Sequence, residues 1–277
     1  MKVRVAEQAG YCYGVERALR LTSEAVERER KPIYTLGPII HNPQVVEEFA
    51  ARDVRQVSGI DDLSEGTIIV RTHGVDPDII IAAEKKGLST VDATCPFVAK
   101  AQQRAAALSK EGYGLVIVGE KEHPEVAGIL AHARGKATVV ESVEETAGIR
   151  GPRIGVVVQT TQSVENLRQI AGSLVAKTAE IKVFNTICNA TIRRQESAKK
   201  LAEEVGMMIV VGGKNSANTS RLSQICRDTG TVSYHIETAR ELKLEWTAGV
   251  EVVGVTAGAS TPEWLLQEVI EKLKEIG

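Results

Sequence analysis

Three cysteines, Cys12, Cys95 and Cys188, each stand where an apolar strand-like run gives way to an amphipathic helix. The three stretches read KVRVAEQAGYCYGVERALRLTSEAVER, LSTVDATCPFVAKAQQRAAALSKEG and IKVFNTICNATIRRQESAKKLAEEVG. Pro96, directly after the second cysteine, suits the first turn of a helix. The chain therefore contains an internal repeat, and its period of about 80 to 95 residues is far longer than the repeat of a solenoid.

Two further sets of three strand-to-helix junctions follow the same period. One set reads YTLGPIIHNPQ, VIVGEKEHPE and IVVGGKNSANTS, and four residues after the glycine that ends each strand come His41, His123 and Ser216. The other set reads IIVRTHGVDP, VVVQTTQSVE and GVTAGASTPE, and its polar loops include His73, Thr160 and Ser260. Strands that alternate with helices in this way predict a small parallel sheet in each repeat.

The repeat predicts an α/β fold of three similar small domains, with parallel sheets in a pseudo-three-fold arrangement. The predicted domains are residues 13–95, residues 96–188, and residues 189–277 completed by the N-terminal strand within 1–12. The third copy lacks one strand, and KVRVAE at the N-terminus would supply it and bring the two termini together. Ligands of parallel α/β sheets bind beyond the carboxyl ends of the strands, so domains that face one another would bring the three cysteines together.

Three thiolates at helix N-termini are suited to a soft metal. Iron–sulfur clusters normally take four cysteines, so three would leave one iron open to act as a Lewis acid. One alternative is a zinc site with three cysteines. The other is that the three cysteines are buried core residues without a metal. Cys226, in RLSQICRDTG, lies inside a helix and outside the register, which indicates a packing role.

The junction loops also carry neutral groups that suit a phosphate. The loops KNSANTSRL and TAGAST offer hydroxyls, an amide and backbone N–H groups. The same side chains could instead cap helices, which is the ordinary role of such residues. The candidates for ligand contact are His41, His73, His123, Thr160, Ser216, Asn218 and Ser260.

Glu125, two residues after His123, has two interpretations. A first-turn acid complements the dipole of its helix. In a site with few other acids, it could instead donate a proton. His132 and His235 lie outside the junction loops and are interpreted as structural.

Charge and hydropathy restrict the partners. The formal net charge of −2 gives no electrostatic footprint for nucleic acid. The N-terminal MKVRVAEQAG lacks the apolar core of a signal peptide, and no run approaches the ~18 apolar residues of a membrane span. We therefore expect a cytoplasmic protein whose thiols stay reduced.

A series of motifs, in order along nearly the whole chain, resembles one known family. The motifs are GYCYGVERA, LGPIIHNP, VRTHG, DATCP, EHPE, QTT, NTICNAT, KNSANTSRL and GVTAGAST. They resemble the 4-hydroxy-3-methylbut-2-enyl diphosphate reductase family, the last enzyme of the methylerythritol phosphate route to isoprenoids. The resemblance implies an oxidoreductase that removes the allylic hydroxyl as water, using two electrons and two protons, to give isopentenyl and dimethylallyl diphosphate.

The resemblance also implies roles for individual residues. A [4Fe–4S] cluster would be held by Cys12, Cys95 and Cys188, with its fourth iron facing the substrate hydroxyl. Thr160 and Glu125 would lie near that hydroxyl and deliver a proton. A ferredoxin or flavodoxin type protein would supply the electrons. The diphosphate would be bound by His41, His73, His123, Ser216, Asn218 and Ser260.

One departure and two rival interpretations remain at this point. The family often has two consecutive serines where this chain has Ser216 and Ala217, so one hydroxyl contact to the diphosphate is in doubt. Quinolinate synthase is a three-fold α/β enzyme with three cysteines on one cluster, but it is expected to lack the EHPE and KNSANT loops. A non-enzymatic iron–sulfur sensor would more plausibly carry a DNA-binding segment, and none is evident in this sequence.

Overall fold

The computed structural model describes residues 1–276, which belong to two compact units. Unit 1 consists of Met1–Val15, Ile40–Val45 and the chain from Asn189 onwards, and unit 2 of Glu16–Ile39 and Val46–Cys188. Helices α1 (Tyr13–Arg28) and α2 (Pro43–Ala50) each begin in unit 1 and continue into unit 2. The predicted α/β class is confirmed, because the described strands form three four-stranded sheets in which every pairing is parallel.

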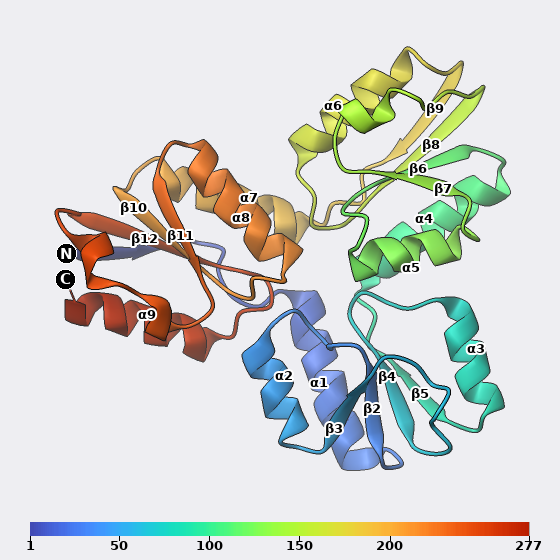
Figure 1. Ribbon diagram of the computed structural model, residues 1–277, viewed down its shortest axis with the longest axis horizontal. Coiled ribbons are helices and arrows are strands. Elements are labelled where there is room, and N and C mark those ends of the chain that lie inside the picture. The colour runs from blue at the N-terminus through green and yellow to red at the C-terminus, as the bar shows by residue number, and fades with distance from the viewer. Residues whose placement is uncertain (277) are drawn as a thin grey trace. The chain divides into compact units, whose positions relative to one another are not determined.

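Unit 1 contains one sheet, in the order β1–β12–β10–β11 (Figure 1). The N-terminal strand β1 pairs in parallel with β12, and Met1 and Ile276 pack against the same core. The strands are β1 (Lys2–Val5), β10 (Met207–Val211), β11 (Val232–Ile236) and β12 (Val252–Ala257). The helices are α7 (Asn189–Ala202), α8 (Ala217–Asp228) and α9 (Glu263–Ile276), with 3-10 turns η2 (Ala239–Glu241) and η3 (Leu244–Thr247).

Alternation along the central strand β10 divides the core of unit 1 into two layers. Met207, Ile209 and Val211 pack with the apolar stripe of α9, whereas Met208 and Val210 pack with α7 and α8. Successive strand side chains point to opposite faces, so a fully apolar strand requires helices on both sides. In Figure 1, α9 accordingly lies on one face of this sheet and α7 and α8 lie on the other.

Unit 2 contains the other two sheets, in the orders β3–β2–β4–β5 and β7–β6–β8–β9. The first is formed by β2 (Ile33–Leu36), β3 (Val54–Val57), β4 (Thr67–Val70) and β5 (Ser89–Asp92), with α3 (Pro77–Lys85). The second is formed by β6 (Gly114–Val118), β7 (Ala137–Val140), β8 (Arg153–Val158) and β9 (Glu180–Phe184). With it come α4 (Pro96–Lys110), α5 (Pro124–His132), α6 (Val164–Val175) and the 3-10 turn η1 (Glu144–Thr146).

Each of the three sheets has the same strand order in terms of the repeat. The two central strands run into the two families of polar loops, and one edge strand runs into a cysteine. The domain boundaries 13–95, 96–188 and 189–277 with 1–12, and the pseudo-three-fold arrangement of the domains, stay predictions.

No helix among the described residues is long and apolar enough to cross a membrane.

Candidate functional site

The backbone N–H of each of the three cysteines makes an equivalent hydrogen bond, so the repeat extends to individual residues. The N–H of Cys12 donates to the carbonyl of Ala259 at 3.2 Å, that of Cys95 to Thr72 at 2.9 Å and that of Cys188 to Thr160 at 3.2 Å. In each copy the acceptor lies two residues after the end of the neighbouring strand, β12, β4 or β8. The parallel pairing therefore continues past the strand ends and fixes each cysteine at its junction.

The three junction cysteines differ in their surroundings from the fourth. Cys12, Cys95 and Cys188 form no disulfide and are of intermediate exposure, and Cys95 directly precedes the first residue of α4. Cys226 is fully buried among apolar side chains of α7, α8 and β10, and burial raises the pKa of its thiol to about 12. A thiol that is so hard to ionise is a poor metal ligand, because the thiolate is the binding form. Its packing environment agrees with the sequence interpretation.

The sequence interpretation did not include Arg194, a buried arginine that hydrogen-bonds to the loop before Cys12. Arg194, on α7, is 4% exposed, and its guanidinium donates to the carbonyl of Gly10 at 2.8 Å. Gly10 has a φ of +87° and lies two residues before Cys12. The available signal was periodic: Arg194 stands four and seven residues before Ala198 and Leu201, so it lies on the buried face of a helix.

The predicted anion-binding loops of unit 1 lie at the start of α8 and between β12 and α9. Ser216 is the N-cap of α8, and its Oγ accepts the N–H of Thr219 at 3.3 Å. Ser260 Oγ donates to the carbonyl of His41 at 3.0 Å. Ser216 therefore caps α8, and Ser260 ties the His41 segment to the loop before α9, while the predicted ligand contacts of both residues stay predictions.

Asn218 is the polar side chain of unit 1 that the fold leaves unsatisfied. It is 5% exposed, and both its Oδ1 and its Nδ2 are buried without a hydrogen-bond partner among the described residues. Such a group costs about 1–3 kcal/mol when it is left unpaired. A side chain that can both donate and accept, placed in the first turn of a helix, indicates a bound ligand rather than a packing role.

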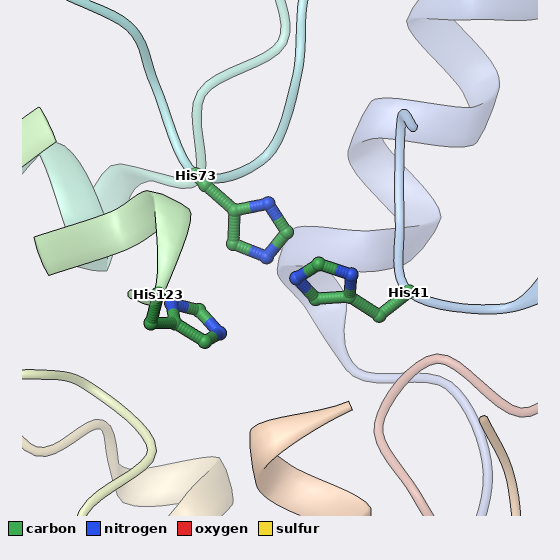
Figure 2. Close-up of side chains that lie close together, drawn as sticks. All are labelled: His41, His73 and His123. Atoms are coloured by element: carbon green, nitrogen blue, oxygen red, sulfur yellow. The ribbon is translucent and has the colours of Figure 1, made fainter. Parts of the chain in front are cut away.

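Two of the predicted histidines meet in unit 2. His73 follows β4, and His123 is the N-cap of α5; their rings meet edge to face with centroids 5.3 Å apart, as Figure 2 shows. The Nδ1 of His123 accepts the N–H of Glu125 at 3.1 Å, so in the neutral ring the proton is on Nε2. His123 is 7% exposed and caps the start of α5 through Nδ1.

Glu125 is buried and does not have the setting of a surface first-turn acid. It is 1% exposed, and its two carboxylate oxygens accept from Thr160, Oε1 from the N–H at 2.6 Å and Oε2 from Oγ1 at 2.9 Å. Burial raises the pKa of Glu125 to about 7, and the bonds from Thr160 only partly oppose this rise. The arrangement gives an acid that is half protonated near neutral pH, which suits general acid catalysis.

The predicted site residues are distributed over both units. The metal and substrate roles assigned to them stay predictions at this stage. Unit 1 holds Cys12, His41, Ser216, Asn218 and Ser260, and unit 2 holds Cys95, Cys188, His73, His123, Glu125 and Thr160.

The fold and these residues define a class of protein. It is a parallel α/β protein whose strand-to-helix junctions present three partly exposed cysteines, polar and imidazole side chains, and one buried acid of raised pKa. Ligand sites of parallel sheets are expected at this position.

Comparison with known proteins identifies the family. The family described as "LytB protein" matches residues 3–274, and the chain belongs to that family. The chain is 51% identical to 4-hydroxy-3-methylbut-2-enyl diphosphate reductase of Geotalea uraniireducens (strain Rf4), over 100% of this chain and 98% of the relative. It is 47% identical to the enzyme of the same name from Aquifex aeolicus (strain VF5), over 98% and 96% of the two chains.

Solved structures give the same result. The structure of (E)-4-hydroxy-3-methyl-but-2-enyl diphosphate reductase, described as the terminal enzyme of the non-mevalonate pathway, matches with a TM-score of 0.73 and 46% identity, over 99% of this chain and 100% of the other. The reductase structure from Plasmodium falciparum matches with a TM-score of 0.94 and 28% identity, over 99% and 88%. These findings favour the reductase interpretation over the quinolinate synthase and sensor alternatives.

Proposed function

We propose that this chain is an oxidoreductase that reductively removes the allylic hydroxyl of 4-hydroxy-3-methylbut-2-enyl diphosphate. One substrate molecule, two electrons and two protons give one water and either isopentenyl or dimethylallyl diphosphate. Family membership supports the substrate, since a relative that is 51% identical carries the name of this reductase. The observation that carries the chemistry is the buried Glu125–Thr160 pair, because cleavage of a carbon–oxygen bond requires a proton for the departing oxygen.

Cys12, Cys95 and Cys188 fit the ligand set of a [4Fe–4S] cluster with one iron not bound by cysteine. All three are partly exposed and outside any disulfide, and each is held at its junction by an equivalent backbone hydrogen bond. When bound, such a cluster supplies the electrons and a Lewis-acidic iron. A zinc site is less well supported, because structural zinc sites normally include two closely spaced ligands and the three cysteines are far apart in sequence.

The diphosphate is assigned to Ser216, Asn218, Ser260 and the three histidines. The two unpaired amide atoms of Asn218 support this assignment, since a phosphate oxygen would satisfy the Nδ2 donor. The start of α8 adds backbone N–H groups and the positive end of a helix dipole. The backbone N–H of Ala217 lies in this turn and would replace the hydroxyl contact that a second serine makes in relatives.

Glu125 and Thr160 would deliver the proton to the substrate oxygen. With a pKa of about 7, Glu125 is protonated in about half of the molecules at neutral pH. Thr160 Oγ1 lies 2.9 Å from Glu125 Oε2, so its hydroxyl can accept the carboxyl proton and pass on its own. Burial of the carboxyl group excludes water and keeps the proton available for the substrate.

The partner that supplies the electrons would be a ferredoxin or flavodoxin type protein. We place the enzyme in the cytoplasm, where the three junction thiols, none of them in a disulfide, would remain reduced for cluster assembly.

The test uses protein that is purified and reconstituted without oxygen, with a chemical reductant as electron donor. We expect consumption of the diphosphate and formation of both C5 diphosphates by mass spectrometry. The allylic alcohol that lacks the diphosphate serves as the matched control and should bind far more weakly. If a fully cluster-loaded protein did not consume the substrate, or bound the alcohol equally well, the proposal would be wrong.

A further inference from the structure

A cavity lies in unit 2, and its lining includes Gly74 and Pro124, the chain neighbours of His73 and His123. It is a cleft of about 550 Å³ between the β2, β3 and β4 loops on one side and α5 on the other. We call it the Arg71 cleft. Its apolar wall includes Leu36, Val57, Ile79 and Ala127, and its polar groups include Arg71 and Asp76. Its volume lies in the range typical of small-molecule sites, and none of the cysteines or proposed substrate ligands lines it.

The guanidinium of Arg71 has no partner in this cleft. Among residues 1–276 it makes no hydrogen bond and no ion pair, and its Nε is buried. The arginines that form ion pairs, such as Arg4, Arg30 and Arg168, all have exposed side chains. Burial lowers the pKa of Arg71 from its ordinary value, yet an arginine stays charged at every physiological pH. Arg71 is half-buried, and a buried guanidinium nitrogen without a partner is costly, so this side chain indicates an anion.

The backbone leaves room for the guanidinium in its present position. Gly37, in the cleft wall, has a φ of +74°, and a Cβ built there would overlap Nη1 of Arg71. The guanidinium therefore lies against a residue without a side chain, directly after the end of β2. The cleft thus combines one unpaired planar donor group with an apolar wall on the α5 side.

The charges in the cleft restrict the kind of anion. Arg71 provides one positive charge, and the carboxylate of Asp76 lines the same cleft. Asp76 caps α3 by accepting the N–H of Asp78 at 2.9 Å. A diphosphate would therefore meet one cation and one nearby acid, whereas a single carboxylate matches the guanidinium fork in charge and shape.

We propose that the Arg71 cleft binds a small monocarboxylate with an apolar body. The carboxylate pairs with the guanidinium of Arg71, and the hydrocarbon packs against Val57, Ile79 and Ala127. This site is separate from the reductase chemistry and does not depend on it.

The test measures hexanoate binding to the cluster-loaded enzyme by saturation-transfer NMR and calorimetry. We expect saturable binding that Arg71→Gln weakens by at least about tenfold, because a bidentate charge-assisted pair is worth more than that factor. Ala127→Leu should also weaken binding, since Ala127 is exposed and its enlargement fills the cleft without disturbing the core. Arg150→Gln is the matched control, an exposed arginine of the same unit outside the cleft, and should bind hexanoate normally.

Three outcomes would overturn the proposal. They are the absence of saturable hexanoate binding to the unmodified enzyme, equal binding by Arg71→Gln, and displacement of hexanoate by inorganic phosphate. Hexanol serves as a neutral probe, and equal affinity for hexanol and hexanoate would likewise exclude a site built around the guanidinium.

Discussion

Replacement of Glu125 by glutamine removes the acidic proton of this residue but keeps the shape of its side chain. Glutamine keeps the volume, and its Oε1 can still accept a hydrogen bond from Thr160, but it has no acidic proton to donate. We expect the variant to bind its cluster and substrate and to lose turnover by a factor on the order of 100 or more. The unmodified enzyme should lose activity as the pH rises above about 7, where the carboxyl group ionises.

The same substitution has a calculable effect on stability. The pKa of Glu125 is raised by burial from 4.5 to about 7, which corresponds to roughly 3 kcal/mol. Below pH 4.5, the pKa of the unfolded state, the carboxyl group is protonated in both the folded and the unfolded state. As the pH rises to the raised pKa only the unfolded state releases the proton, so the free energy of unfolding falls across this window and is constant above it. Glu125→Gln removes this fall.

The assay is urea unfolding without oxygen at about pH 5 and about pH 8, on either side of the raised pKa. Between these conditions the unmodified protein should lose roughly 2–3 kcal/mol more than Glu125→Gln, because all other titrating groups are shared. Identical pH dependence in the two proteins would show that Glu125 is not a buried acid of raised pKa. Full turnover in Glu125→Gln would remove it from the mechanism and direct attention to Thr160 or a histidine.

Three further predictions concern binding and packing. Serine at any one of the junction cysteines should lose or damage the cluster, whereas Cys226→Ala should keep it at a cost of about 1–2 kcal/mol, as iron content, absorbance and urea unfolding will show. Asn218→Leu should keep or raise the free energy of unfolding, because it removes an unsatisfied amide, yet weaken diphosphate binding at least about tenfold in calorimetry. Gly66→Ala should destabilise the protein by more than about 2 kcal/mol, since a Cβ would overlap the Pro32 carbonyl oxygen, while Gly87→Ala, also at positive φ but with open space around it, should cost less in the same unfolding assay. The junction cysteines are Cys12, Cys95 and Cys188.

Much of the fold was predictable because the repeat carries both local and topological information. Three copies of one strand–helix pattern reduce the sheet problem to a single unit, and parallel connections leave few ways to order its strands. The strand absent from the third copy is supplied by Lys2–Val5, which pairs with β12. The same regularity places the cysteines, since each N–H finds its acceptor two residues beyond a neighbouring strand.

The environment of individual polar residues was not predictable in the same way. Glu125 has the sequence pattern of a surface first-turn acid, and only the approach of Thr160, 35 residues later in the chain, shows that it is buried. Helical spacing places Arg194 on the buried face of α7, but nothing in the sequence indicates that its partner is the Gly10 carbonyl or that Arg71 lines a cleft. Burial of a polar side chain depends on neighbours from distant segments, and no local pattern in one sequence specifies them.

The unsatisfied polar atoms of unit 1 connect its stability with its proposed ligand. Within residues 1–276, the buried amide of Asn218 lacks a hydrogen-bond partner, and so do the hydroxyls of Thr219 and Thr256, both fully buried. Thr219 packs where Gly212 and Gly258 allow close approach, so its hydroxyl has little room for water. The Asn218 amide alone costs about 1–3 kcal/mol when unpaired. A ligand that binds only the folded state, present at one hundred times its dissociation constant, returns about 2.7 kcal/mol. The cost of the unpaired Asn218 amide and the stabilisation by a bound ligand are therefore of the same size. A bound diphosphate would offset the destabilisation at the start of α8.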